Sequence, residues 1–226
     1  MFQVSAAWKA AYPQAHAGVL VLRDVINPPR HTGLDEQKSM LEKQLRARFA
    51  GQERADIVQQ PVMQAYTAYY RDFKKTYHVQ LQLESILFRG TAIPRVAALV
   101  EAMFMAEMDN LLLTAGHDLD ALQLPVSLDV AQDGERYTAL RGLEQETKAG
   151  DMLMRDGAGI ISSILYGPNQ QTQISARTKN VIFTVYAPEG IDEPTILEHL
   201  LAIQKNVLII APRARVEMLK VFGAQD

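Results

Sequence analysis

The residues most suited to catalysis lie together in one short segment, Gly116-His117-Asp118-Leu119-Asp120. A histidine titrates near neutral pH and a neighbouring carboxylate can raise its pKa, so His117 beside Asp118 is a natural pair for moving protons in catalysis. The alternative is a turn in which Asp118 bonds nearby backbone amides and His117 takes no part. We take His117 and Asp118 as the catalytic candidates and keep the turn as the alternative.

A second set of side chains is typical of a binding cavity. Glu107, like Glu101, interrupts a nearly continuous apolar run. A charge in such a run needs an arginine or a ligand amine as its partner, unless the helix turns it outward. Methionines make an adaptable cavity lining, although they more often fill gaps in a core. The expected substrate contacts are Met103, Glu107, Asn110, Ser163, Tyr166 and Asn169.

Several other kinds of enzyme chemistry have no support in the sequence. The chain contains no cysteine, which excludes disulfides, thiolate catalysis and cysteine-ligated zinc. The histidines form no HxH, HxxxH or HExxH pattern, so we expect no dedicated metal site. The motifs GxSxG, GxxxxGK[ST] and GxGxxG are missing too. We therefore expect no serine nucleophile elbow and no ATP, dinucleotide or other cofactor.

Short helices and strands must position these residues, and their order along the chain predicts the fold class. The predicted helices span about 32–49, 61–74, 80–89, 96–108 and 195–204. The predicted strands span about 18–25, 126–130, 152–155, 160–166, 180–186 and 207–210. Because helices cluster first and strands later, we expect an α+β fold with β-sandwich or mixed sheets flanked by helices.

Composition limits the partners that the chain can bind. The 226 residues carry a net charge of −3, so any contact with RNA must come from a local basic patch. Arg71, Lys74 and Lys75 form one such cluster; compensation of a helix dipole is the simpler interpretation, and an RNA contact is the alternative. The N-terminal residues lack a signal-like apolar stretch, and no apolar run is long enough to span a bilayer. We therefore expect a cytoplasmic protein without membrane contact.

The order of turns between Thr114 and Tyr186 resembles a known family, the B3/B4 domain of the phenylalanyl-tRNA synthetase β subunit. The resemblance covers roughly 90–188. It rests on an apolar helix followed by these segments in order: Gly116–Asp120, Gly134–Tyr137, Arg141-Gly142, Gly150–Leu153, Asp156, Gly167 and Thr178. The strings QLESIL, TAGHDLD, SSILYGPN and FTVYAP are similar to stand-alone proteins of the family. The resemblance thereby implies a single B3/B4-like domain over 1–226. Its expected parts are a mainly helical segment 1–89, the core 90–188, and a C-terminal helix and strand at 189–226.

The B3/B4 module removes wrongly attached amino acids from tRNA. The resemblance therefore implies an RNA-associated hydrolase that edits misacylated aminoacyl-tRNA in trans, with tRNA or aminoacyl-tRNA as its partner. Three places depart from the family's editing site: Ala115 replaces a histidine, Met103-Phe104 replaces a Thr-Asn pair, and Thr184 replaces a glutamate. The alternative is therefore a non-catalytic module that binds a free amino acid or a similar small molecule on the same scaffold.

Overall fold

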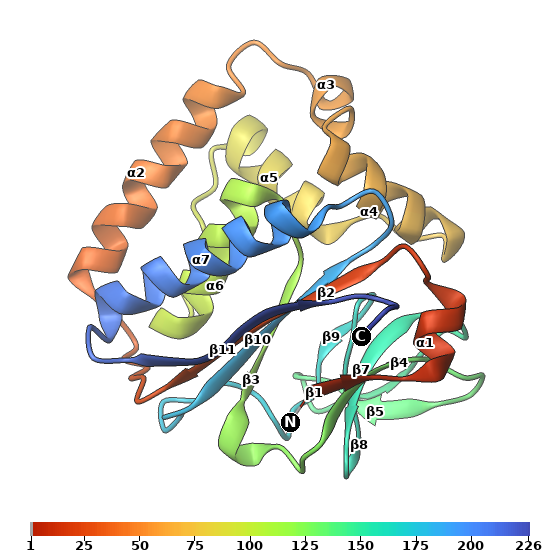
Figure 1. Ribbon diagram of the computed structural model, residues 1–226. Helices are drawn as coiled ribbons and strands as arrows, with labels where there is room; N and C mark the ends of the chain where they lie inside the picture. Colours follow the sequence, from red (N-terminus) through yellow and green to blue (C-terminus); the bar gives the residue numbers. More distant parts are fainter. Residues whose placement is uncertain (1) are drawn as a thin grey trace.

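The computed structural model describes residues 2–226, in which helices cover one face of a sheet and a second sheet faces the other (Figure 1). The helix-covered sheet has the order β11 (Arg215–Phe222), β2 (His16–Arg23), β10 (Val181–Ala187), β3 (Thr114–Asp118). The larger sheet has the order β1 (Phe2–Val4), β4 (Val126–Val130), β7 (Met152–Asp156), β8 (Gly159–Ser163), β9 (Gly167–Pro168). A separate hairpin pairs β5 (Arg136–Thr138) with β6 (Glu144–Glu146).

The helices lie mainly on one side of the molecule (Figure 1). They are α1 (Ala6–Ala11), α2 (Thr32–Arg48), α3 (Arg54–Val58), α4 (Pro61–Asp72), α5 (His78–Arg89), α6 (Ala98–Asn110) and α7 (Glu193–Ile210). A short 3-10 helix, η1 (Leu119–Ala121), follows β3. Helix α7 packs on both α6 and β2, so it joins the helical layer to the sheet.

The alternation of side chains in β2 explains this layering. Leu20 and Leu22 pack in the core under the helices, whereas Val19 and Val21 pack in a second cluster with Ile182 of β10. Successive side chains of a strand point to opposite faces, so the apolar sequence of β2 buries both of its faces. The predicted α+β class, with mixed sheets flanked by helices, is confirmed.

One predicted element at the C-terminal end is wrong. The sequence predicts a strand at 207–210, but α7 continues through Ile210. Ile203, Val207 and Ile210 recur at helical spacing and are buried on one face of this helix, which is the packing that extends it. The strand of this region is β11, whose first half is exposed and charged at the edge of the sheet.

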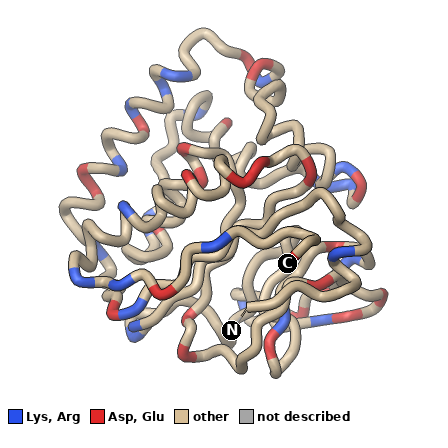
Figure 2. The backbone as a smooth tube through the Cα atoms, viewed as in Figure 1, with Lys and Arg blue, Asp and Glu red and all other residues tan. Residues whose placement is uncertain are grey.

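Charges of both signs are interspersed along the chain (Figure 2). Many of them are paired: Arg155 bridges Asp129 and Glu135, with shortest N–O distances of 2.9 and 2.6 Å. Within residues 2–226, no helix is both long and apolar enough to cross a membrane. The surface thus carries no dominant charge, and any strong electrostatic site must be local.

Candidate functional site

A cavity of about 380 Å³ lies where α5 and α6 meet β3 and the β8–β9 loop. This volume falls in the usual range for small-molecule sites. The residues that line it are His78, Gln82, Val96, Val100, Met103, Phe104, Glu107, Leu113, Thr114, Ala115, Gly116, Leu140, Ser163, Ile164, Gly167, Pro168, Gln173, Ile174 and Tyr186. Most of this lining is apolar, and a few polar groups converge within it.

Helical periodicity explains how two helices supply one wall. Val100, Phe104 and Glu107 are separated by four and three residues, so they share a face of α6. On α5, His78 and Gln82 are four residues apart and share a face in the same way. The two faces meet because α5 and α6 pack against each other.

Glu107 is the buried carboxyl group of this wall. It is 2% exposed, and its Oε1 accepts a hydrogen bond from the backbone amide of Thr114 at 2.8 Å. Desolvation raises the pKa of Glu107 to about 8, so its carboxyl group is mostly protonated at neutral pH. Among residues 2–226 no cation forms an ion pair with it. Glu107 therefore offers an uncompensated acid to whatever enters the cavity.

Glu101, earlier in α6, shows what a compensated buried carboxylate looks like in the same helix. It pairs with the buried ammonium of Lys38 and accepts a hydrogen bond from the backbone amide of Val96 at 2.9 Å. The expected arginine partners are not used, because Lys38 of α2 reaches this position instead. The two acids of the apolar run thus differ: Glu101 is neutralised by a lysine, and Glu107 faces the cavity.

His78 supplies a nitrogen lone pair beside the same cavity. The hydroxyl of Tyr70 donates its single proton to the carbonyl of Ile164 at 2.7 Å. The Nδ1 of His78 lies 3.1 Å from that hydroxyl oxygen, so Nδ1 carries the hydrogen and donates it. This tautomer leaves Nε2 as an acceptor. The packing of the ring against Tyr70 partly desolvates the imidazole and lowers the pKa of His78, so the ring is neutral at pH 7 even though the residue as a whole is exposed.

Ser163 connects the cavity to a second buried carboxylate. Its hydroxyl donates to Asp151 Oδ2, and the hydroxyl of Tyr69 donates to Asp151 Oδ1 at 2.7 Å. Desolvation raises the pKa of Asp151 to about 6, while these two hydrogen bonds act in the opposite direction. Because the proton of Ser163 points to Asp151, its oxygen lone pairs remain free to accept hydrogen bonds.

The structure brings three of the expected substrate contacts together, and it places the other three elsewhere. Met103, Glu107 and Ser163 line the cavity. Asn110 instead bonds Nδ1 of His199 at 3.3 Å. Tyr166 lies under the ammonium of Lys75, 4.8 Å from its ring centre, and Asn169 is buried and bonded to Thr172.

The two expected catalytic residues do not line the cavity. His117 is fully buried, and its Nδ1 donates to Thr172 Oγ1 at 2.7 Å, because that hydroxyl gives its proton to Asn169. Burial also lowers the pKa of His117 to about 3, which keeps the ring neutral. Asp118 accepts hydrogen bonds from the amide of Asp120 and the hydroxyl of Thr178. This is the geometry of the turn alternative.

His78 is the functional candidate that the sequence did not single out. As one of several scattered histidines it matched no motif. Its chemical state depends on a tyrosine one helix earlier and on a carbonyl almost ninety residues later. The spacing to Gln82 was the one local signal, because it predicts a shared helical face.

The positions that depart from the family's editing site lie in or near this cavity. Ala115, Met103 and Phe104 line it. Thr184 is buried on β10 directly opposite Ala115, and its hydroxyl has no hydrogen-bond partner among the described residues. The cavity therefore occupies the region to which the resemblance assigned editing, with different side chains in it.

A known family matches the region that contains this cavity. The B3/4 domain family matches residues 62–193, more than half of the chain and every residue that lines the cavity. The phenylalanine–tRNA ligase beta subunit of Oleidesulfovibrio alaskensis is 34% identical over 77 residues, which are 33% of this chain and 10% of that protein.

A solved structure is similar over a longer stretch. It is an N-terminal fragment of the phenylalanyl-tRNA synthetase β subunit from Pyrococcus horikoshii, with a TM-score of 0.49 and 11% identity. The similarity covers 98% of this chain and 50% of that fragment. The chain thus spans only part of each of these relatives. From the match over residues 62–193, the chain belongs to the B3/4 domain family.

Proposed function

We propose that this protein hydrolyses the ester bond of misacylated aminoacyl-tRNA, acting in trans as an editing enzyme. The family supports a role related to aminoacyl-tRNA synthesis, since its relative here is named a phenylalanine–tRNA ligase beta subunit. The observation that carries the proposal is the pairing of a free histidine acceptor and an uncompensated buried acid, His78 and Glu107, in one mostly apolar cavity.

Glu107 is suited to hold the α-amino group of the substrate. A bound ammonium supplies the positive charge that the empty site lacks, so it favours the ionised form of the carboxyl group. Glu107 then releases its proton on binding below pH 8. An ester without an amine gains nothing from this contact, which gives the site a preference for aminoacyl groups.

His78 is suited to orient the attacking water. Its Nε2 accepts a hydrogen bond from the water and then its proton, as the water oxygen bonds to the ester carbonyl carbon. The bond between that carbon and the ester oxygen breaks, and the proton passes to the leaving oxygen. The products are a free amino acid and a free terminal hydroxyl on the tRNA. The catalytic roles expected for His117 and Asp118 are assigned to this residue instead.

The apolar wall selects the amino-acid side chain by shape. Met103, Phe104 and Ile174 bound the cavity, and methionine adapts to irregular outlines. A misfit of one methylene in such a pocket changes binding by about 1–3 kcal/mol, so shape alone gives moderate discrimination.

The test is deacylation of a panel of misacylated tRNAs that includes tyrosyl-tRNA(Phe). We expect cleavage well above the rate in buffer for at least one of them. Absence of cleavage across the whole panel would overturn the proposal that the protein is a hydrolase.

A second candidate is a non-catalytic module that binds a free amino acid. The observation that favours it is the departure at Ala115, Met103, Phe104 and Thr184, because none of these side chains can replace an editing histidine or glutamate. Thermal unfolding in the presence of each free amino acid separates the two. Stabilisation by a free ligand, without hydrolysis of any ester, supports this second function.

A further inference from the structure

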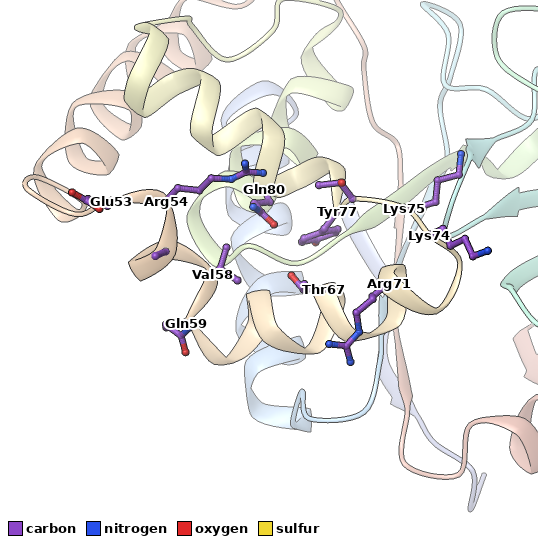
Figure 3. A pocket seen from close by; sticks show the side chains of 12 residues that line it. Glu53, Arg54, Val58, Gln59, Thr67, Arg71, Lys74, Lys75, Tyr77 and Gln80 are labelled. Carbon is purple, nitrogen blue, oxygen red and sulfur yellow. The ribbon is translucent and has the colours of Figure 1, made fainter.

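An open groove of about 850 Å³ lies between α3, α4 and α5 (Figure 3). Its described lining holds four cations and one carboxylate, which makes it locally basic on a chain of net charge −3. Figure 3 shows Arg54 near one end of the groove and Lys74 and Lys75 near the other. The side chains that line it are Glu53, Arg54, Ala55, Val58, Gln59, Thr67, Arg71, Lys74, Lys75, Thr76, Tyr77 and Gln80.

Three of the four cations have no acidic partner among residues 2–226. Arg54 pairs with Glu84 at 2.8 Å, but Arg71, Lys74 and Lys75 form no ion pair there. All three side chains are exposed. Charges that are neither paired nor buried remain available to an anionic ligand.

The cations at the C-terminal end of α4 favour the helix dipole by their charge alone, and their hydrogen-bond donors are not used for it. At the C-terminal end of α4, the carbonyls of Tyr70 and Arg71 accept hydrogen bonds from the backbone amides of residues 73–75. The carbonyl of Phe73 accepts one from Lys148, at 2.6 Å. Among the described residues, the side chains of Arg71, Lys74 and Lys75 donate no hydrogen bond to these carbonyls, so their donors remain free for a ligand.

The groove also holds a spare hydrogen-bonding group. The hydroxyl of Thr67 lines it and has no partner among the described residues. A buried hydroxyl without a partner costs free energy, and a ligand oxygen would satisfy it. An anion with several oxygens fits both this hydroxyl and the neighbouring cations.

The basic end of the groove reaches the rim of the cavity. The ammonium of Lys75 lies 4.8 Å from the ring centre of Tyr166, and Tyr166 lies in the chain between the cavity residues Ile164 and Gly167. His78, three residues after Lys75, lines the cavity itself. A chain of phosphates in the groove would thus lead to the cavity mouth.

We propose that this groove binds the phosphodiester backbone of a single-stranded RNA end, whose terminal ester enters the cavity. The inference rests on the proposed function and names the surface by which its substrate is held. An acidic peptide or an anionic membrane would meet the same cations but would gain nothing from the adjoining cavity. Both are outcomes that the test distinguishes.

The first experiment measures binding of an RNA hairpin that carries no amino acid and has a single-stranded 3′ end. Binding is followed by fluorescence anisotropy at several salt concentrations. The double variant Arg71→Glu/Lys74→Glu reverses two exposed charges of the groove. The matched control is Lys43→Glu/Arg213→Glu, which makes the same change in net charge at exposed cations on α2 and after α7. Thermal unfolding confirms that both variants are folded.

The groove variant should bind RNA about tenfold more weakly at low salt, and its logarithmic salt slope should fall by about 0.7 for each phosphate that it no longer neutralises. The control should stay within about twofold of the wild-type protein, since its cations lie outside the groove. Equal RNA affinity of the two variants would overturn the inference. Wild-type binding to an acidic peptide or to anionic vesicles, but not to RNA, would overturn it too.

A second experiment separates this inference from the proposed hydrolase. Aminoacyl-adenosine carries the ester but no phosphodiester chain. The groove variant should cleave it at the wild-type rate while it loses cleavage of the aminoacyl-RNA. If the wild-type protein cleaves neither ester, the hydrolase fails, and the RNA-binding measurement still decides the role of the groove.

Discussion

The cavity and the groove both use α5, yet they hold their polar groups in opposite states. His78 and Gln82 line the cavity, whereas Gln80 lines the groove from another face of the same helix, together with Tyr77 at the N-cap. In the cavity, burial keeps Glu107 protonated, and the lowered pKa of His78 keeps its ring neutral. In the groove, solvent keeps the cations charged. We therefore expect pH to control the cavity and salt to control the groove.

The strongest effect that we predict is the loss of catalysis on substitution of His78. His78→Gln removes the basic Nε2, since an amide oxygen can accept a hydrogen bond but cannot take the proton, and it should lower kcat for ester cleavage by about 100-fold or more, the usual contribution of a general base. His117→Gln is the matched control, because His117 is equally a neutral ring but does not line the cavity. Steady-state deacylation kinetics of the two variants decide it. A larger loss in His117→Gln than in His78→Gln would return the catalytic role to His117.

The next effect concerns stability, and it follows from the raised pKa of Glu107. Between about pH 4.5 and pH 8 the unfolded chain releases this proton while the folded protein keeps it, so unfolding becomes easier as pH rises. Glu107→Gln removes that penalty and still offers an oxygen to the amide of Thr114. At pH 8.5 the variant should be more stable than the wild-type protein by on the order of 4 kcal/mol, and at pH 4 equally stable.

Urea unfolding at a series of pH values measures this difference. A stability gap between Glu107→Gln and wild type that does not change with pH would show that Glu107 is ionised in the folded state. In that case Glu107 would be charged like the cations of the groove, and the predicted difference in protonation between cavity and groove would not hold for this residue.

A smaller effect concerns the role of Glu107 in binding. Affinity for an amino-acid ester analogue that resists hydrolysis should rise with pH up to about pH 8, because the bound ammonium requires an ionised carboxylate. The same analogue without its amine should show no such dependence. Glu107→Gln should lower the affinity for the amine by about tenfold and flatten the pH profile, as calorimetry can measure. Identical profiles for both ligands would exclude Glu107 as the amine site.

The weakest effect that we predict depends on the shape of the cavity. A Cβ at Gly116 would lie 2.8 Å from Cδ1 of Ile174, a flexible end that can move aside. Gly116→Ala should therefore displace Ile174, which lines the cavity, and weaken binding of the larger ligands by about threefold at a stability cost of about 1 kcal/mol. Unchanged preference among ligands of different size would show that Ile174 does not contact the ligand's side chain.

Much of the fold could be predicted because its signals are local. The nearly continuous apolar run of helix formers at 96–108 and the capping glycine after Arg89 correspond to α6 and α5 within two residues. The prediction of a strand at 207–210 is wrong because a short apolar segment fits a strand or a buried helix equally well. Its state is decided by α7, whose buried face continues through it.

The candidate site was less predictable because its chemistry is set by contacts distant in sequence. Glu107 stood out because a charge in an apolar helix needs an explanation. His78 did not, because its tautomer depends on Tyr70 and on a carbonyl of the β8–β9 loop. His117 and Asp118 are adjacent in sequence, but Asp118 accepts a hydrogen bond within a turn and His117 is bonded to Thr172, outside the cavity lining.

The separate roles of the two sites, ester cleavage in the cavity and phosphate binding in the groove, can be tested by comparing two substrates with the same aminoacyl group. Wild-type kcat/KM for an aminoacyl-RNA and for the matching aminoacyl-adenosine is measured at low and at high salt. We expect both esters to be cleaved, and we expect salt to lower kcat/KM only for the RNA ester, through its phosphate contacts. Equal salt dependence of the two esters, or cleavage of neither, would contradict the division.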